Sequence, residues 1–324
     1  MKGIVVEGKN LRWQEVPVPE LGVGQVRISV AATAINRADL VQRQGGYPPP
    51  PGASNILGLE CAGTVMEIGE GVTRVAPGDR VCALLAGGGY AEQVVVPAGQ
   101  VLKMPVALDF VQAASLPEVF ATAYLNLYME ANLAKGERVV IHAGASGVGT
   151  AAIQMCRAFH NPCFVTAGSV DKIERCRALG AEGGIDRHAG GFHDPVMTWS
   201  EGTGVDVILD PVGASYFKDN VSLLRINGRL VLIGLMGGAQ TEANLGQLLM
   251  KRLRVIGSTL RARPISEKAA VMDQLRERVW PLLETGAIKA VVDAVYPIEK
   301  AEEAHALVEG NGTFGKVVMT IGQA

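Results

Sequence analysis

Hydrophobic and polar positions alternate along the first third of the chain. In residues 25–34 every second position is apolar, from Val26 to Ala34, and the positions between them are mostly polar. This period of two is typical of a half-buried strand. Further short apolar runs, separated by glycine and proline turns, follow at residues 61–68, 80–85 and 90–96. The pattern predicts an antiparallel, barrel-like β domain with little helix.

From about Ala113 the pattern changes to strands that alternate with helices. An apolar helix is expected over residues 119–128. Strands are then predicted at residues 138–141, 163–167, 205–210, 228–234 and 254–258. Helices are predicted at residues 148–159, 172–179 and 216–224. Repeated strand–helix units need crossover connections, so this region predicts an α/β fold with a parallel, doubly wound sheet. The chain should close with a helix at 266–285, a strand at 291–295, a helix at 299–310 and a strand at 316–321.

The most informative stretch is the glycine turn after the strand at 138–141. Gly144 and Gly149 occupy the first and third glycine positions of a dinucleotide-binding fingerprint, whereas Ser146 stands at the middle position. Glycines let the backbone approach a pyrophosphate, and the start of the following helix offers N–H donors to an anion. The candidate cofactor-binding residues here are Gly144, Ala145, Ser146, Gly147, Val148 and Gly149. A plain strand-to-helix turn would give a similar pattern.

Composition narrows the class of protein. The chain has 324 residues, of which 48% are hydrophobic and 19% charged, with a net charge of −2. No stretch concentrates Lys and Arg, so we expect no nucleic acid or membrane partner and favour small-molecule chemistry. The five cysteines are scattered, and charge appears early in the sequence. We therefore expect a reduced, cytoplasmic protein.

Several short motifs together carry a family resemblance. They are residues 34–39, 58–63, 77–81, 143–149 and 312–318. With them, the chain resembles the medium-chain dehydrogenase/reductase superfamily over essentially its whole length. The stretches at 36–40, 42–52 and 143–149 look like its zinc-free, zeta-crystallin-like quinone oxidoreductases, most of all the NADPH-dependent, tumour-suppressor-inducible branch.

The resemblance implies two domains and a dimer. A GroES-like, β-rich catalytic domain would comprise residues 1–120 and 262–324, and a Rossmann cofactor-binding domain would comprise residues 121–261. Relatives pair the last strands of two cofactor domains, so we expect a homodimer built around residues 254–258.

Three positions indicate whether the chain can bind zinc. Where zinc alcohol dehydrogenases place a catalytic cysteine and histidine, this chain has Asn36 and Leu59, and the four-cysteine structural lobe is missing. Glu60 alone cannot hold zinc, which needs about three protein ligands even in open sites. We expect no metal, and hence an acceptor that takes a hydride readily, such as a quinone or another activated carbonyl compound.

The second Rossmann strand indicates which cofactor binds. NAD enzymes keep an acidic residue at this strand end for the ribose hydroxyl. Here the strand is followed by Gly168, Ser169 and Lys172, which suit a 2′-phosphate, and the resemblance assigns them that role. Asp171 is a competing carboxylate nearby. We expect NADPH, with Arg187 either a second cation or a solvated surface residue.

Other site residues follow from the resemblance. Asn36 would face the nicotinamide and donate its amide to a carbonyl oxygen, although it could be an ordinary turn residue. Tyr47 would contact the acceptor and could donate a proton, or it simply packs on the adjacent prolines. Thr122 would lie near the nicotinamide, or it bonds its own helix. Lys316 could reach a phosphate or cover the surface.

The ends of the late strands complete the candidate cofactor site. An open α/β sheet places its ligand crevice at these ends. The residues there are Gly234, Leu235, Met236, Ser258 and Leu260. The expected activity is direct hydride transfer from NADPH to a quinone held between the domains. An NADPH-dependent enone or enoyl-thioester reductase is the neighbouring alternative, and an NADPH-binding structural or regulatory protein with little turnover is the alternative from another class.

Overall fold

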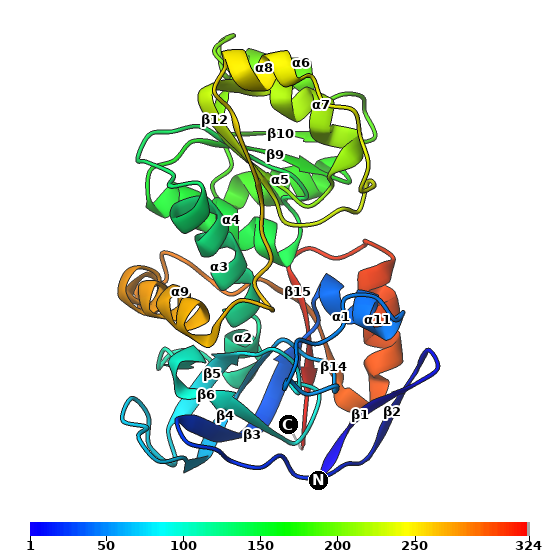
Figure 1. The fold of residues 1–324 in the computed structure, drawn as a ribbon, viewed down its shortest axis with the longest axis vertical. Helices are drawn as coiled ribbons and strands as arrows, with labels where there is room; N and C mark the ends of the chain where they lie inside the picture. Colours follow the sequence, from blue (N-terminus) through cyan, green and yellow to red (C-terminus); the bar gives the residue numbers. More distant parts are fainter. Residues whose placement is uncertain (323–324) are drawn as a thin grey trace. The chain divides into compact units, whose positions relative to one another are not determined.

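A computed structural model describes residues 1–322 of the chain. It contains two compact units: Met1–Ala121 together with the chain from Leu260 onward, and Thr122–Thr259. The two points at which the chain passes from one unit to the other lie one and two residues from the predicted domain boundaries. Figure 1 shows both units as ribbons coloured along the sequence. Among the described residues, no helix is both long enough and apolar enough to cross a bilayer.

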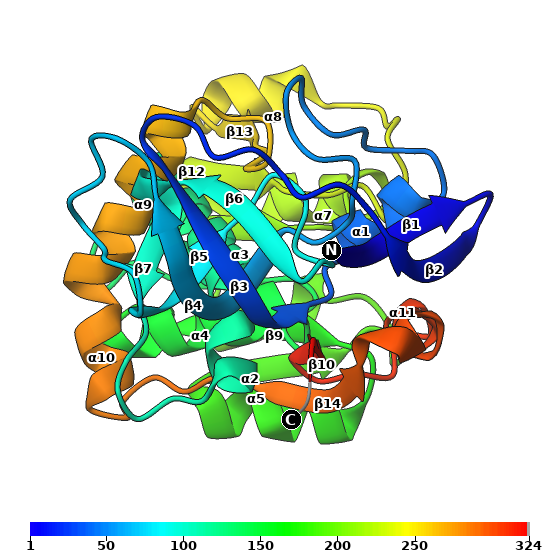
Figure 2. The same cartoon turned by 90° about the horizontal axis from the view of Figure 1, so that it is seen from below.

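The first unit is built on a seven-stranded sheet. Its strands are β3 (Gln25–Ala34), β4 (Glu60–Ile68), β5 (Arg80–Leu84), β6 (Gln93–Pro97), β7 (Val101–Lys103), β14 (Val292–Pro297) and β15 (Lys316–Thr320). The order is β14-β15-β3-β4-β5-β7, with β6 paired to β3, and of the described pairs in this sheet only β14–β15 is parallel. Figure 2 shows β3 to β6 side by side. A separate antiparallel hairpin is formed by β1 (Lys2–Glu7) and β2 (Asn10–Glu15).

Strand β3 shows why this sheet forms. Val26, Ile28 and Val30 are buried in the core, as the alternation predicts. Gly63 of β4 faces the β3 backbone so closely that a Cβ there would lie 2.0 Å from the Ser29 carbonyl oxygen. Glycine at this position therefore permits the register shift between β3 and β4.

Helices connect and cover this sheet. They are α1 (Arg37–Arg43), α2 (Phe110–Ala114), α3 (Pro117–Tyr124), α9 (Ile265–Arg278), α10 (Trp280–Glu284) and α11 (Ala301–Glu309), with short 3₁₀ segments at Ala98–Gln100 and Ile298–Lys300. The single helix predicted over 266–285 is wrong, because α9 ends at Arg278 and α10 begins at Trp280. Pro281 explains the break, since its ring lacks an N–H and clashes with the preceding turn.

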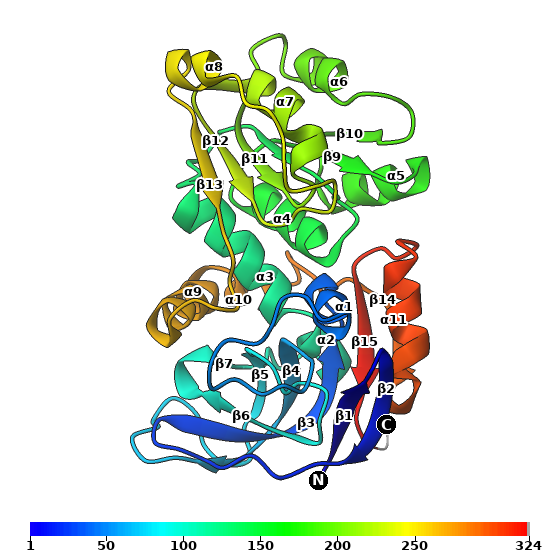
Figure 3. The ribbon, with the colours of Figure 1, turned by 45° about the vertical axis from the view of Figure 1, so that its right-hand side comes forward.

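The second unit is a six-stranded parallel sheet. Its strands are β8 (Val139–Ile141), β9 (Cys163–Ala167), β10 (Gly183–Asp186), β11 (Val205–Asp210), β12 (Leu224–Leu232) and β13 (Arg254–Gly257). The order β10-β9-β8-β11-β12-β13 is the Rossmann order 3-2-1-4-5-6. The connecting helices are α4 (Gly147–Ala158), α5 (Val170–Leu179), α6 (His193–Trp199), α7 (Ala214–Leu223) and α8 (Leu245–Met250), seen around the sheet in Figure 3. The predicted fold class, a GroES-like β-rich domain plus a doubly wound Rossmann domain, is confirmed.

The helix predicted over 119–128 changes its winding part-way. α3 ends at Tyr124 and a π-helical segment, Leu125–Glu130, follows. The Asn126 side chain donates to the Thr122 carbonyl oxygen at 2.7 Å and so competes for an acceptor of the regular helix. Such π turns are commonly found at functional sites.

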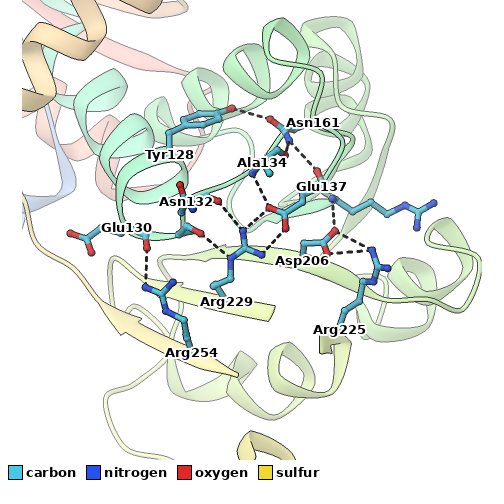
Figure 4. Close-up of polar contacts among 12 residues, drawn as sticks. Tyr128, Glu130, Asn132, Ala134, Glu137, Asn161, Asp206, Arg225, Arg229 and Arg254 are labelled. Carbon is cyan, nitrogen blue, oxygen red and sulfur yellow. Dashed lines mark hydrogen bonds and ion pairs between the residues drawn. The ribbon is translucent and has the colours of Figure 1, made fainter. Parts of the chain in front are cut away.

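A buried arginine fixes the end of this π segment to the Rossmann sheet. Arg229 of β12 donates to the carbonyl oxygens of Ala131 and Asn132 and pairs with both carboxylate oxygens of Glu137, at 2.9 and 2.6 Å. Figure 4 shows Arg229 at the centre of this group, with the Asp206–Arg225 pair beside it. Because the arginine is only 8% exposed, these bonds anchor the segment firmly.

Candidate active site

The polar centre of the first unit lies where β3 ends and β15 begins. Asn36 directly precedes α1, and its Oδ1 accepts from Lys316 Nζ at 2.7 Å. Lys316 Nζ also contacts Glu60 Oε1 at 2.8 Å and the Ile35 carbonyl oxygen at 2.6 Å. Both charged side chains are at least 95% buried. A buried ion pair of this kind holds its geometry because neither charge has water to replace its partner.

This arrangement bears on the predicted phosphate contact of Lys316. An ammonium group has three N–H donors, and the three oxygen partners around Lys316 account for all of them. A phosphate contact would require one of these bonds to break. It stays a prediction, and the bonds instead assign the side chain a role in orienting Asn36.

The carboxamide of Asn36 is held from both ends. Its Nδ2 donates to Glu60 Oε1 at 2.9 Å and to the Ala34 carbonyl oxygen at a longer 3.3 Å. The side chain is half-buried. If Asn36 donates to an acceptor oxygen as predicted, it would give up the longer and weaker of these two bonds, the one to the Ala34 carbonyl oxygen.

Two further carboxyl groups lie in this centre. Glu118, near the start of α3, donates its main-chain N–H to Glu60 Oε2 at 2.9 Å. Burial, with added repulsion from Glu60, raises the pKa of Glu118 to about 8. Burial likewise raises the pKa of Asp39 to about 6, although main-chain N–H groups of Asn36 and Gly58 donate to it. Glu118 is therefore mostly protonated at neutral pH.

Tyr47 lies in the proline-rich loop in an unusual backbone conformation. Its φ is +48°, a left-handed value that is costly for a bulky residue. Its carbonyl oxygen accepts from Arg261 Nη1 at 3.0 Å, and the Arg261 guanidinium lies 5.4 Å from the centre of the Tyr47 ring. The ring is half-buried, so the tyrosine is held in place while part of it stays exposed.

In the second unit, the glycine turn joins β8 to α4. Ser146 is the N-cap of α4, and its hydroxyl accepts from the Gly149 main-chain N–H at 3.0 Å. Capping gives a physical reason for serine at the middle position of the fingerprint. A Cβ on Gly149 would lie 2.5 Å from the Ala143 carbonyl oxygen, and one on Gly144 would lie 2.7 Å from Val165. Ala145 is buried, whereas Gly147 and Val148 are half-buried in the first turn of the helix.

A buried polar network starts at His142, directly before this turn. His142 contacts Thr166 Oγ1 at 3.1 Å and Asn220 Oδ1 at 2.8 Å, and Asn220 donates to Asp210 Oδ2 at 3.0 Å. Asp210 accepts in turn from the main-chain N–H groups of Val212 and Gly213. Burial lowers the pKa of His142 to about 4 and raises that of Asp210 to about 6. The network thus ties the glycine turn to the end of β11 with an uncharged imidazole.

The end of β9 carries the residues predicted to bind a 2′-phosphate. No acidic residue stands at the strand end, and Ser169 is the N-cap of α5, accepting from the Lys172 main-chain N–H. A Cβ on Gly168 would meet nothing closer than the Arg187 guanidinium, at 3.8 Å. Asp171 is exposed in the first turn of α5. Gly168 thus lies next to the Arg187 guanidinium.

The remaining candidates are distributed over both units. Thr122, Gly234, Leu235, Met236 and Ser258 belong to the second unit, whereas Leu260 belongs to the first. Leu235 and Met236 are 55% and 54% exposed after β12, as ligand-contacting apolar residues would be before binding. Leu260 is buried, so a direct cofactor contact from its side chain would need rearrangement. These roles stay predictions.

Comparisons with known proteins assign the chain to a family. An alcohol dehydrogenase GroES-like domain matches residues 22–106, and a zinc-binding dehydrogenase domain matches residues 147–277. The synaptic vesicle membrane protein VAT-1 homolog of Rattus norvegicus is 34% identical over 94% of this chain and 78% of its own. The chain belongs to the zinc-free quinone oxidoreductase family of medium-chain dehydrogenases/reductases.

Two solved structures relate this member of the quinone oxidoreductase family to named activities. The Escherichia coli quinone oxidoreductase complexed with NADPH superposes with a TM-score of 0.86 at 28% identity, covering 98% of each chain. CurK enoyl reductase gives a TM-score of 0.84 at 28% identity, covering 99% of each chain. The chain is accordingly an oxidoreductase of the superfamily, related to pyridine-nucleotide-dependent enzymes.

Sequence reasoning missed polar residues in each of the two units. Glu118, Arg261, Lys268 and the His142–Asp210 network were not among the candidates. Burial marks Arg261, Lys268 and the network, and the bond to Glu60 marks the half-buried Glu118; both signals depend on contacts between segments far apart in sequence. Of the described residues, no three His, Cys, Asp or Glu side chains form a group that could hold a metal ion.

Proposed function

We propose that the protein is a zinc-independent, NADPH-dependent quinone oxidoreductase. The observation that carries this proposal is the end of β9, where Gly168 lies next to the Arg187 guanidinium and the strand ends in Ala167, Gly168 and Ser169 without an acidic residue. The similarity to a quinone oxidoreductase complexed with NADPH supports the choice of cofactor and acceptor.

Each group of residues has a defined task in this proposal. The first turn of α4, capped by Ser146, would hold the pyrophosphate, and Lys172 and Arg187 would pair with the 2′-phosphate. When bound, the cofactor supplies two electrons as a hydride. Asn36, held by Lys316 and Glu60, and Tyr47 would bind and orient the acceptor oxygen, on which negative charge develops.

The acceptor follows from the side chains around Asn36. Asn36 and Leu59 stand where a Lewis-acid metal would need ligands, and Glu60 is already paired with Lys316. An acceptor whose reduced form delocalises negative charge needs only hydrogen bonding for its stabilisation. We therefore propose a quinone or another activated carbonyl compound as the partner molecule.

One specific observation favours a second candidate function. CurK enoyl reductase shares 28% identity over nearly the whole chain. An enone or enoyl-thioester reductase would use the same cofactor and the same oxyanion support. Activity with enoyl-thioesters but not with quinones would favour this alternative, and NADPH binding without turnover would favour a structural or regulatory role.

We further propose a cytoplasmic homodimer. Strand β13 is an edge of the Rossmann sheet, and Val255 on it is 40% exposed. The Ser258 N–H donates to the Leu232 carbonyl oxygen, so by alternation the N–H groups of Val255 and Gly257 point to the open edge. An edge of this kind can pair with the same edge of a second copy.

The test of the proposed activity is cofactor oxidation by the purified protein. NADPH and NADH are compared with ortho-quinones, para-quinones and an enoyl-thioester as acceptors. We expect oxidation with quinones and faster reaction with NADPH. Failure with every quinone would contradict the proposal.

A further inference from the structure

Arg261 is a buried cation with an unused donor group. It is 3% exposed, its Nε donates to the Ala86 carbonyl oxygen at 2.8 Å, and its Nη1 donates to the Tyr47 carbonyl oxygen at 3.0 Å. Its Nη2 is buried and has no hydrogen-bond partner among residues 1–322. A buried donor that lacks a hydrogen bond destabilises the fold, most of all when it belongs to a charged group. The bonds from Nε and Nη1 already join Arg261 to the segments that contain Ala86 and Tyr47. The buried Nη2 adds nothing to this link.

The guanidinium lies against the candidate acceptor-binding residue. The Tyr47 ring is 5.4 Å from it, and the left-handed backbone of Tyr47 is held by the bond to Nη1. Strained backbone that the surroundings maintain is a common feature of ligand-binding positions. Tyr47 and Glu118 are half-buried, whereas Arg261 and Lys268 are buried.

The charges around this position favour an anion. Lys268 Nζ donates to the Arg261 carbonyl oxygen at 3.1 Å and adds a second buried cation. Glu118 is the carboxyl group that interacts with Arg261, Lys268 and Tyr47, and it is mostly protonated at neutral pH. Asp39 also attracts Arg261, but it accepts two main-chain hydrogen bonds. Two cations therefore face one largely neutral acid, Glu118, and one mostly ionised acid, Asp39, whose carboxylate already accepts two main-chain N–H groups.

We propose that Arg261 is a substrate-binding residue whose Nη2 holds an acceptor oxygen that carries or develops negative charge, with the planar ring of the acceptor against Tyr47. The inference rests on the proposed function and names its substrate class: planar conjugated carbonyl compounds, bound most tightly as anions. In the reaction, the quinone gains a hydride with its two electrons and becomes a hydroquinone anion. A proton from water completes the hydroquinone, and NADPH leaves as NADP⁺. Arg261 keeps its own proton throughout.

The test measures binding without turnover. The probes are 2-hydroxy-1,4-naphthoquinone, which is an anion at neutral pH, and neutral 1,4-naphthoquinone, titrated into the protein without cofactor. We expect wild type to prefer the anion, and Arg261→Gln and Arg261→Lys to weaken anion binding by about tenfold or more, as for loss of a charge-assisted hydrogen bond. Binding of the neutral probe should change much less. Arg263→Lys, in the same loop but paired with Glu267, is the matched control and should leave both affinities unchanged.

Several results would overturn the inference. One is a cooperatively folded Arg261→Gln variant that binds the anion as wild type does, and another is an equal loss in Arg263→Lys. If the Arg261 variants do not fold, wild type decides alone, because anion binding no tighter than neutral binding contradicts the proposal. Failure of wild type to oxidise NADPH with quinones would instead contradict the proposed function, while the binding result would stand separately.

Discussion

At the scale of single residues, the site depends on a buried ion pair that positions an uncharged amide. Lys316 and Glu60 are 5% and 0% exposed, and both contact Asn36. Their value lies in orientation, since a buried pair gains little net stability over apolar packing. Removing one partner, however, leaves the other charge buried and unpaired.

Lys316→Met should therefore destabilise the protein by about 3–5 kcal/mol. The measurement is the free energy of unfolding from urea denaturation. Lys300→Met is the control, because Lys300 and Glu303 form an exposed pair at 3.6 Å and such pairs are worth about 0–1 kcal/mol. Similar losses in the two variants would contradict a special role for the buried pair.

Glu118→Gln should change how stability depends on pH. The ordinary pKa of this carboxyl group is 4.5, and burial raises its pKa to about 8 in the folded protein. The unfolded chain therefore loses this proton first, and stability contributed by the protonated form is lost as pH rises towards 8. Wild type should lose stability relative to Glu118→Gln between about pH 5 and pH 8.5, as measured by urea unfolding at each pH. A difference in stability between the two proteins that stays constant with pH would refute the raised pKa of Glu118.

At the scale of elements, the glycine turn between β8 and α4 keeps its shape because its glycines carry no Cβ. In Gly149→Ala the new Cβ would lie 2.5 Å from the Ala143 and Gly144 carbonyl oxygens, so the turn must shift. Overpacking of this kind costs about 1–3 kcal/mol. NADPH affinity, measured by fluorescence titration, should fall by about tenfold or more as the turn moves from its binding geometry. Gly191→Ala is the control, because a Cβ there meets nothing within 4 Å; equal affinities in the two variants would contradict this account.

How much of the fold the sequence predicts depends on how local the signal is. Strands β3, β9 and β11 match their predicted bounds because period-two alternation or a continuous apolar run is a local feature. The break before α10 was missed although Pro281 was visible, since helical periodicity continues across it. The π segment after Tyr124 could not be predicted, because it goes with a side-chain bond within the helix and with anchoring by Arg229 from a distant strand.

The same contrast between local signals and long-range contacts applies to the candidate site residues. Asn36, the glycine turn and the end of β9 lie in recognisable motifs, so the sequence alone marks them as candidates. Arg261 and Glu118 lie in no such motif. Their importance comes from contacts with Tyr47 and Glu60, more than fifty residues away in the chain. Whether any of these residues touches a ligand stays a prediction.

At the scale of the whole molecule, the proposed dimer depends on the exposed edge of the Rossmann sheet. Val255→Glu would place like charges at a two-fold edge-to-edge contact and should weaken the dimer by about tenfold or more. Sedimentation velocity over a concentration series measures the dissociation constant. Val106→Glu, at a 92% exposed position in the other unit, is the control and should not change it. A wild-type protein that stays monomeric would contradict the proposed dimer.

The proposed activity has one direct measurement: anaerobic oxidation of NADPH by purified protein with limiting 1,4-naphthoquinone, followed at the absorbance of the reduced cofactor. We expect one NADPH to be consumed per quinone reduced and none without acceptor or protein. The rate with NADH should be lower by about tenfold or more, since the proposed bonds to the 2′-phosphate are then lost. A rate no higher than that without protein, or a preference for NADH, would contradict the proposed activity.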